Sequence, residues 1–358
     1  MKFSGFAATG PKDFTGIKKV TYEPKPFGDY DIDIKIEACG VCGSDCLTLS
    51  GEWGDYNTPL VVGHEIVGDV VAVGPKAKTG LKVGDRVGVG AQSFACLECK
   101  VCEKHHENYC PDQVDTYNGY YKDGVQSQGG YASHVRTHEH FVFKIPPQLA
   151  SELAAPLMCA GITTYAPLKQ FLDLQTEKTG LKVGVVGLGG LGHIAVMFAK
   201  KMGFEVHVFS RGDLKKADAL KMGADFYHDS SSPDMGKDIR FELDLILSTA
   251  NVSSIPLAGY LSTLKVFGKF ITLGLPPHPF SLKAFDLLAN GVSLGSSHLG
   301  NREEMIEMLQ FASDHGIKPW VEKLPISKDN VEKGLQNTSK SKCRYRLVFI
   351  NFEKEFEQ

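Results

Sequence analysis

Apolar residues in the first quarter of the chain come in short runs of the kind that form β-strands. Residues 31–37 alternate polar and apolar positions, and residues 60–74 form a longer run rich in valine and isoleucine. Prolines at positions 24, 26 and 59 punctuate these runs in the way that turns do. This pattern predicts a compact, mostly β domain over residues 16–89.

From residue 183 onward the pattern changes to strands that alternate with helices. An apolar strand at 183–187 is followed by a glycine-rich turn, a helix at 194–202 and a second strand at 205–210. Further candidate strands lie at 225–227, 243–248, 269–273 and 292–295. Six strands joined in this way predict an α/β fold with a complete, parallel Rossmann sheet.

Three more elements complete the outline. Residues 153–165 are helix-like and carry Cys159, and residues 302–313 form an amphipathic helix with charged flanks. Residues 346–350 are strand-like again and are a candidate to return to the first domain. We therefore expect the divisions between two domains near residues 154/155 and 296/297.

Composition excludes several classes of protein. The 358 residues are enough for roughly two domains. Acidic residues outnumber basic ones by 42 to 39, and the chain has no basic run of the kind that binds nucleic acid or a membrane surface. The first residues lack a signal-peptide core, and no window approaches the ~20 apolar residues that span a bilayer. We expect a soluble, cytoplasmic protein.

Four of the nine cysteines are grouped in a short lobe at about residues 93–113: Cys96, Cys99, Cys102 and Cys110. Such grouping in a cytosolic chain indicates a metal site before disulfides. Four thiolates at this spacing enclose a tetrahedral zinc and leave no open position, so the site is structural. An iron–sulfur cluster is the main rival, and the long last gap disfavours it. A nucleic-acid-binding zinc knuckle is disfavoured by the near-neutral charge.

A second candidate site begins where His64 and Glu65 interrupt the apolar run at 60–74. Burying this pair demands partners, and either a metal or other core side chains can supply them. Cys42 lies in a cysteine-rich turn about twenty residues earlier, where a metal ligand and an inert buried thiol are both reasonable. Cys159 has no ligand-type neighbour and by itself suits core packing.

The glycine-rich turn fits the dinucleotide motif G-x-G-x-x-G, and it reads Gly187, Leu188, Gly189, Gly190, Leu191, Gly192. Its place between a strand and a helix makes a weak motif strong. The glycines let a pyrophosphate approach the backbone and accept N–H groups at the helix N-terminus.

The residues after the second Rossmann strand indicate which nicotinamide cofactor binds. Enzymes that select NAD place an acid there, whereas this chain has Ser210 and Arg211, with Lys215 one helical turn further on and Asp213 beyond the strand tip. A guanidinium and an ammonium suit the added 2′-phosphate of NADP. The alternative is that Arg211 and Lys215 are ordinary solvated charges.

Taken together, these residues resemble the zinc-dependent medium-chain dehydrogenase/reductase superfamily and, within it, the cinnamyl alcohol dehydrogenase family in its fungal NADP-dependent form. The resemblance rests on Gly63-His64-Glu65 through Gly68 and Gly74 to Ala77, the four-cysteine lobe, the glycine-rich turn, and residues 296–309. It implies a catalytic GroES-like domain (1–154 and 297–358), an NADP-binding Rossmann domain (155–296), and a homodimer.

The resemblance also assigns roles to residues of the second site. It implies a catalytic zinc, the second zinc of the chain, with three ligands: Cys42, His64 and Cys159. Glu65 would be an alternate ligand, Asp45 would orient His64, and Ser44 would start the proton relay. Family members commonly carry a histidine three residues after the relay hydroxyl, where this chain has Leu47. Leucine cannot pass a proton, so the relay runs differently here.

The implied reaction is hydride transfer between NADP(H) and an aliphatic or aromatic aldehyde or primary alcohol, such as a cinnamaldehyde. Further implied cofactor contacts are Thr163, Ser296 and Arg344. Candidate walls of the substrate pocket are Trp53, Phe94 and Tyr120, each of which equally suits ordinary core packing. The alternatives are a zinc polyol or secondary-alcohol dehydrogenase of the same fold and, more remotely, a zinc-binding protein without catalysis.

Overall fold

The computed structural model describes residues 1–12, 14–252 and 254–356, and the chain divides into two compact units. Unit 1 comprises Met1–Ile162 and Gly300–Gln358, and unit 2 comprises Thr163–Leu299. Cys159, which the sequence assigned to the Rossmann domain, thus belongs to unit 1. None of the helices in the described part of the chain is long and apolar enough to cross a bilayer.

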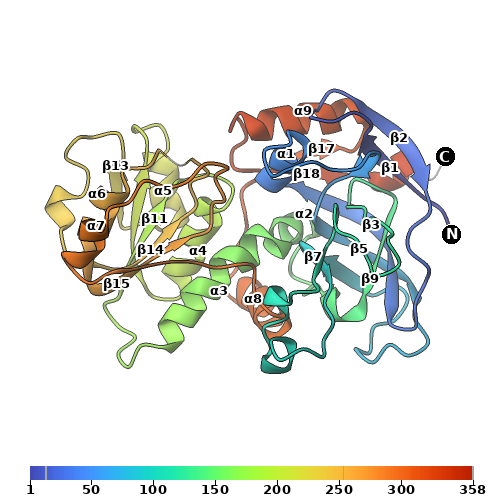
Figure 1. Ribbon diagram of the computed structural model, residues 1–358, viewed down its shortest axis with the longest axis horizontal. Helices are drawn as coiled ribbons and strands as arrows, with labels where there is room; N and C mark the ends of the chain where they lie inside the picture. The colour runs from blue at the N-terminus through green and yellow to red at the C-terminus, as the bar shows by residue number, and fades with distance from the viewer. Residues whose placement is uncertain (13, 253, 357–358) are drawn as a thin grey trace. The chain divides into compact units, whose positions relative to one another are not determined.

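Unit 1 is built on a sheet in which β3 is central. The strands in spatial order are β10 (Phe143–Lys144), β6 (Arg86–Val89), β5 (Glu65–Val73), β3 (Asp31–Val41), β18 (Arg346–Ile350) and β17 (Val321–Pro325), with β9 (His134–His138) also paired to β3. The late strand β18 pairs antiparallel with the early strand β3, and Figure 1 shows both strands within unit 1. The expected return of the chain to the first domain is therefore confirmed.

The alternating pattern of β3 explains its place in the core. Ile32, Ile34 and Ile36 are all buried and belong to the main apolar cluster of unit 1. On the other positions Asp33 pairs with Arg136, with 2.7 Å between Oδ1 and Nε.

Smaller elements complete unit 1. They are β2 (Ile17–Tyr22), β1 (Phe3–Ala8) and β4 (Leu60–Val61) in one sheet, β7 (Gln92–Phe94) and β8 (Val114–Asp115) in another, and the helices α1 (Gly43–Leu49), η1 (Cys102–Lys104), η2 (Glu107–Tyr109), η3 (Glu139–Phe141), α2 (Ser151–Ala154), η4 (Ala155–Met158), α8 (Arg302–Asp314), α9 (Lys328–Ser339) and α10 (Phe352–Phe356).

The helix expected over residues 153–165 is interrupted, so that prediction was wrong in its continuity. The chain forms α2, then the 3₁₀ turn η4, and resumes as α3 (Ala160–Asp173). Pro156 stands in the first turn of η4, where it has no N–H for an α-helical bond. Cys159, between the two helices, leaves helical geometry with φ −125° and ψ −67°.

Unit 2 is a six-stranded, wholly parallel sheet, as predicted. Its strands in spatial order are β13 (Phe226–Asp229), β12 (Glu205–Ser210), β11 (Lys182–Val186), β14 (Leu243–Ser248), β15 (Leu264–Thr272) and β16 (Ser293–Ser296). The connecting helices are α4 (Gly192–Lys201), α5 (Lys216–Met222), η5 (Lys237–Ile239), α6 (Leu257–Thr263) and α7 (Ala284–Leu288). The order reverses direction at β11, which is the point where Rossmann folds bind dinucleotides.

Candidate functional site

Four side chains from separate segments of unit 1 meet in one buried cluster. Cys42 follows β3, His64 and Glu65 stand at the start of β5, and Cys159 occupies the break between η4 and α3. Their potential ligand atoms all lie within 4.8 Å of one another. The folding of the sheet therefore brings together residues that are more than a hundred positions apart in the chain.

The cluster fits a metal ion. His64 Nε2 and Glu65 Oε2 are buried, and neither has a hydrogen-bond partner among the described residues. Leaving a buried polar group unsatisfied costs ~1–3 kcal/mol, so two such atoms beside two thiols need an explanation. Thiolate and imidazole are the donors that zinc prefers, and an ion bound among these atoms would satisfy both orphaned groups.

The electrostatics of the cluster favours the thiolate form of Cys42 and acts in the opposite direction on His64. The pKa of the Cys42 thiol is held well below its usual value, chiefly by a hydrogen bond from the Cys159 thiol and against the opposing effect of burial. Burial acts to lower the pKa of His64, but the neighbouring Cys42 and Asp45 more than offset it, and the net direction is upward. Zinc binds a thiolate and a neutral imidazole, so an ion bound here would find Cys42 already in its ligating form and would displace any proton on His64.

Asp45 supports the cluster through the backbone. Its carboxylate accepts hydrogen bonds from the backbone N–H groups of Cys42 (2.9 Å) and Gly63 (3.2 Å). Among the described residues, no hydrogen bond joins Asp45 to the His64 ring that it was expected to orient. One buried carboxylate thus ties the start of α1 to the segment that carries His64.

Two tyrosines of this site were missed by the sequence reasoning. Tyr131 donates its hydroxyl to Asp45 Oδ2 at 2.7 Å. The Tyr117 ring stacks on His64, with 5.4 Å between ring centroids and 3° between planes. Tyr131 follows a glycine pair, which hinted at close packing, whereas nothing in the sequence around Tyr117 distinguishes it from a core tyrosine.

Arg346 was also missed. Its guanidinium forms an ion pair with Glu65, and both side chains are buried. Gly40 makes room for this carboxylate, because a Cβ built there would stand 2.0 Å from Glu65 Oε2. The signal in the sequence was an arginine at the start of the otherwise apolar strand β18, since a buried charge requires a partner.

Ser44 lies beside the cluster, at 3.5 Å between its Oγ and the Cys42 sulfur, and it is partly exposed. Leu47, on the same short helix, is also partly exposed. Ser44 is therefore placed to exchange a proton with a group bound at the cluster, and Leu47 offers no polar atom to continue the transfer.

The four-cysteine lobe brings its thiols as close together as a zinc site requires. The sulfur atoms are 3.5 Å apart for Cys96 and Cys110, 3.6 Å for Cys99 and Cys102, and 4.0 Å for Cys96 and Cys102. A tetrahedron with Zn–S bonds of ~2.3 Å has sulfur–sulfur edges of about 3.8 Å. These distances are far longer than a disulfide bond, so the lobe fits one tetrahedral ion.

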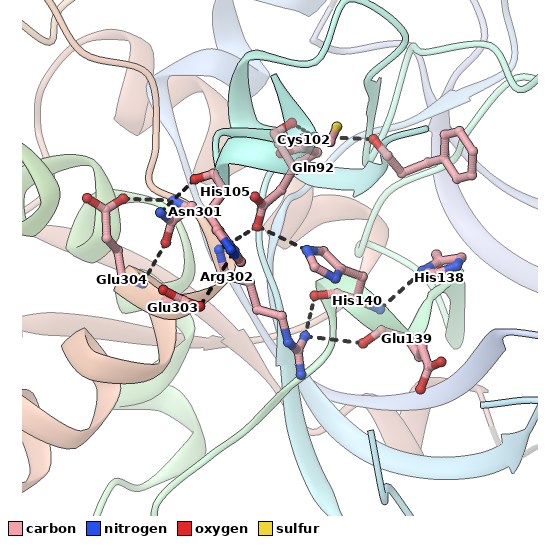
Figure 2. Close-up of polar contacts among 12 residues, drawn as sticks. Gln92, Cys102, His105, His138, Glu139, His140, Asn301, Arg302, Glu303 and Glu304 are labelled. Atoms are coloured by element: carbon pink, nitrogen blue, oxygen red, sulfur yellow. Dashed lines mark hydrogen bonds and ion pairs between the residues drawn. The ribbon is translucent and has the colours of Figure 1, made fainter. Parts of the chain in front are cut away.

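Glu107, in η2 of the lobe, ties the lobe to the start of α8. Its carboxylate accepts hydrogen bonds from the backbone N–H of Arg302 at 2.7 Å and pairs with His140 Nε2 at 3.0 Å. Asn301 Nδ2 adds a bond to the carbonyl oxygen of His105 at 2.8 Å. Figure 2 shows His105, Asn301, Arg302 and His140 gathered around this junction.

The glycine-rich turn of unit 2 has the shape of a phosphate cradle. Gly187 has φ +88°, and a Cβ on Gly192 would lie 1.8 Å from the carbonyl oxygen of Gly187, so neither position accepts a side chain. A Cβ on Gly189 would meet nothing within 4 Å, which leaves its outer side open. The turn leads directly into α4 and therefore fits a dinucleotide pyrophosphate.

The residues expected at the 2′-phosphate surround the end of β12. Ser210 ends the strand, and the Arg211 side chain is exposed. Lys215 donates its ammonium to the carbonyl oxygen of Leu188 at 2.6 Å and so bridges to the glycine-rich turn.

The other expected cofactor contacts come from both units. Thr163 is the first residue of unit 2, and Ser296 ends β16 with its hydroxyl bonded to the carbonyl oxygen of Thr272. Arg344 belongs to unit 1, where its side chain is exposed and its backbone N–H bonds Glu322.

The three candidate substrate residues all lie in unit 1. Trp53 and Tyr120 are exposed by 42% and 49%, so neither is a core residue. Tyr120 accepts a hydrogen bond from Asn57 Nδ2 at 2.5 Å. Phe94 is partly buried, with its ring edge-on to His138.

Comparison with known proteins identifies the family of the chain. Residues 28–147 match the family model described as alcohol dehydrogenase GroES-like domain, and residues 190–314 match that described as zinc-binding dehydrogenase. NADP-dependent alcohol dehydrogenase 6 of Saccharomyces cerevisiae is 46% identical, covering 99% of this chain and 98% of the relative.

Solved structures resemble the whole chain. A cinnamyl alcohol dehydrogenase from Sorghum bicolor matches with a TM-score of 0.91 at 35% identity, covering 98% of both chains. The crystal structure of CAD from Helicobacter pylori, a complex with NADP(H), matches with a TM-score of 0.89 at 34% identity and the same coverage.

Proposed function

This chain belongs to the zinc-dependent medium-chain alcohol dehydrogenases, in their cinnamyl alcohol dehydrogenase group, and we propose that it works mainly as an NADPH-dependent aldehyde reductase. It is an oxidoreductase that moves a hydride between a nicotinamide and the carbon of an alcohol or aldehyde. The observation that carries the proposal is the buried meeting of Cys42, His64 and Cys159.

In this proposal Cys42, His64 and Cys159 hold the catalytic zinc, and Glu65 is an alternate ligand. When bound, the ion supplies Lewis acidity at the substrate oxygen. The protein supplies rigidity: Asp45 fixes the backbone on either side of the cluster, and Arg346 neutralises Glu65. The four-cysteine lobe holds the structural zinc, and its closed ligand set leaves it no part in the chemistry.

Ser44 is the proposed first proton donor to the substrate oxygen. Its hydroxyl stands beside Cys42 and is partly exposed, which suits a group that both reaches the substrate and exchanges with water. Because the Leu47 side chain cannot accept or donate a proton, proton transfer beyond Ser44 passes through the cofactor ribose or another group to water.

The proposed cofactor is NADP(H), and the yeast relative and the Helicobacter pylori structure carry that cofactor in their names. We assign the pyrophosphate to the glycine-rich turn and the 2′-phosphate to Ser210, Arg211 and Lys215, with further contacts from Thr163, Ser296 and Arg344. Replacing Arg211→Asp should raise the KM for NADPH far more than the KM for NADH, because only NADPH carries the 2′-phosphate. Equal changes for both cofactors would refute this assignment.

The proposed substrates are aliphatic and aromatic aldehydes, with Trp53, Phe94 and Tyr120 as apolar walls of the pocket. The exposure of Trp53 and Tyr120 supports a role at a surface rather than in a core. The test follows NADPH consumption with benzaldehyde and cinnamaldehyde, and NADP reduction with sorbitol and secondary alcohols. Faster turnover of the polyol or the secondary alcohols would favour the alternative substrate class.

We also propose a homodimer in which β16, one of the two edge strands of the unit 2 sheet, pairs with its counterpart. Phe267, Phe285 and Leu288 are exposed by 78%, 79% and 71%, which is unusual for large apolar side chains. Phe267 donates its backbone N–H to Asn290, close in sequence to β16. Sedimentation velocity should give twice the chain mass, and Phe267→Asp should shift the protein toward monomer.

The thiolate ligands suit a reducing compartment, and we propose that the protein works in the cytoplasm.

A further inference from the structure

The loop between β12 and α5 is hydrogen-bonded to two side chains of the neighbouring strand β13. Gly212, at the centre of this loop, has φ +60°, and both of its backbone polar groups are engaged. Its N–H donates to Asp229 Oδ1 at 2.8 Å, and its carbonyl oxygen accepts the Tyr227 hydroxyl at 2.5 Å. Two side chains of β13 thus fix the backbone of Gly212, in the loop that follows β12.

We propose that Tyr227 is a positioning residue for cofactor selection: by holding Gly212, with Asp229, it sets the direction in which Arg211 presents its guanidinium to the 2′-phosphate of NADPH. The inference rests on the proposed function, because it takes the 2′-phosphate to be bound at Arg211.

The position of Arg211 makes such support necessary. Its side chain is exposed, and among the described residues no hydrogen bond or ion pair engages its guanidinium. A long, flexible side chain loses rotamer freedom when it binds, and a loop that also moved would raise that cost. Since Gly212 directly follows Arg211, fixing its peptide groups fixes the backbone from which the guanidinium extends.

Strand β13 also holds the residue that precedes Arg211. Ser210, another residue assigned to the 2′-phosphate, lies in register with Asp229 of β13. The backbone N–H of Ser230 donates to the carbonyl oxygen of Ser210 at 3.0 Å, which continues the contact between the two strands past their ends. Strand β13 therefore holds the residues that precede and follow Arg211, and Tyr227 holds the second of them.

Asp229 is not the acid that selects NAD in other Rossmann folds. That acid ends the second strand, where this chain has Ser210, whereas Asp229 ends the third strand of the sheet in chain order. Its Oδ1 is already engaged by the backbone N–H and hydroxyl of Ser231, at 2.9 and 2.6 Å, in addition to Gly212. The Asp229 carboxylate therefore stabilises the conformation of the loop.

The test is the Tyr227→Phe variant, which removes the hydroxyl and keeps the ring. We expect the KM for NADPH to rise by roughly 3- to 10-fold, as the loss of one hydrogen bond would give, with kcat and the KM for NADH unchanged. The matched control is Ser262→Ala, which removes a hydroxyl bond to the carbonyl oxygen of Gly259 in α6 of the same unit. That control should leave both cofactors unaffected.

A double-mutant cycle with Arg211→Ala tests whether Tyr227 acts through Arg211. In the Arg211→Ala background, Tyr227→Phe should have no further effect on NADPH. An equal loss for NADPH and NADH, an additive loss in the double variant, or no change in Tyr227→Phe would each overturn the inference. Failure of Arg211→Ala alone to change the preference for NADPH over NADH would instead refute the proposed cofactor site on which the inference depends.

Discussion

The two cysteine-containing clusters of unit 1 reach similar ligand geometry by opposite routes. The lobe draws all four ligands from residues 96–110, and its small apolar core consists largely of the ligands themselves together with Ala95, Leu97 and Phe141. The second cluster consists of Cys42, His64, Glu65 and Cys159 and is called the catalytic cluster after its proposed role; it draws its ligands from residues as distant as 42 and 159, all of them buried. Neighbours in sequence make the first cluster, and the main sheet makes the second.

This difference indicates what each metal does for the protein. A lobe with so little apolar core depends on its metal for folding energy. The catalytic cluster is instead held by Asp45, Tyr131 and the Glu65–Arg346 pair, so that its ligands stay in place without an ion. Removal of zinc should therefore unfold the lobe, whereas the catalytic cluster should lose its activity and keep its structure.

The largest effect is expected for Cys42→Ser, which removes a ligand of the catalytic cluster. Turnover should fall by about 1000-fold or more, because the Lewis acidity is lost, and bound zinc should fall from two ions per chain to one. The melting temperature should change little, because the sheet keeps the cluster in place. Cys46→Ser is the matched control: Cys46 lies on α1, which begins directly after Cys42, and donates to the carbonyl oxygen of Leu335, which serine can also do. A fully active Cys42→Ser enzyme would contradict the assignment.

The next effect concerns the buried ion pair between Glu65 and Arg346 at the catalytic cluster. Arg346→Met leaves the buried Glu65 carboxylate without its counter-charge, and removing one partner of a buried pair costs ~3–5 kcal/mol. Urea denaturation should show this loss, and the double variant Glu65→Gln with Arg346→Met should recover much of it. If the single variant were as stable as the parent, the pair would not be holding the cluster.

Cys102→Ser should distinguish the role of the lobe from the role of the catalytic cluster. Bound zinc should again fall to one ion per chain, but here the melting temperature should drop, by roughly 5–10 °C, because the lobe loses its folding energy. Turnover per folded molecule should fall much less than in Cys42→Ser. Cys343→Ser, at a cysteine outside both clusters, is the control and should keep two zinc ions.

The smallest effect concerns Glu107, the link between the lobe and α8. Burial alone would raise its pKa, but His140 and the backbone N–H of Arg302 more than offset this and lower it to about 2. A carboxyl whose pKa is depressed in the folded state stabilises the protein above the unfolded value of about 4.5, and this contribution is lost as the pH falls from there toward 2. At neutral pH Glu107→Gln should cost about 1 kcal/mol.

The pH dependence gives Glu107→Gln a second readout. The stability difference between the parent and the variant should narrow as the pH is lowered from about 4.5 toward 2, because the Glu107 carboxyl of the unfolded parent then binds a proton while that of the folded parent stays ionised. Urea midpoints measured at several pH values would show this. A difference that stays constant across the same range would mean that the Glu107 charge does not support the junction with α8.

Local pattern sufficed for some of these features. The spacing of the lobe cysteines and the glycine-rich turn after an apolar strand predicted a four-thiol cluster and a parallel sheet, and the structure contains both. Cys159 is different, because its own neighbours suggested core packing and a continuous helix. Its encounter with Cys42 depends on a helix break at Pro156 and on the packing of distant segments.

The residues that were missed share this long-range origin. Arg346 reaches Glu65 because the last strand of the chain pairs with β3, and Tyr131 reaches Asp45 across 86 positions of sequence. Tyr227 resembles any strand tyrosine until β13 pairs with β12. Sequence alone does not show such partners, because each residue has an equally ordinary alternative in its own local context.

The central claim is that residues far apart in the sequence bind the zinc that carries the chemistry. X-ray diffraction from crystals of the protein, measured at wavelengths on either side of the zinc absorption edge, tests it most directly. We expect two anomalous peaks per chain, one among the four lobe cysteines and one among Cys42, His64 and Cys159. A zinc-replete, active enzyme with a peak in the lobe alone would contradict the account.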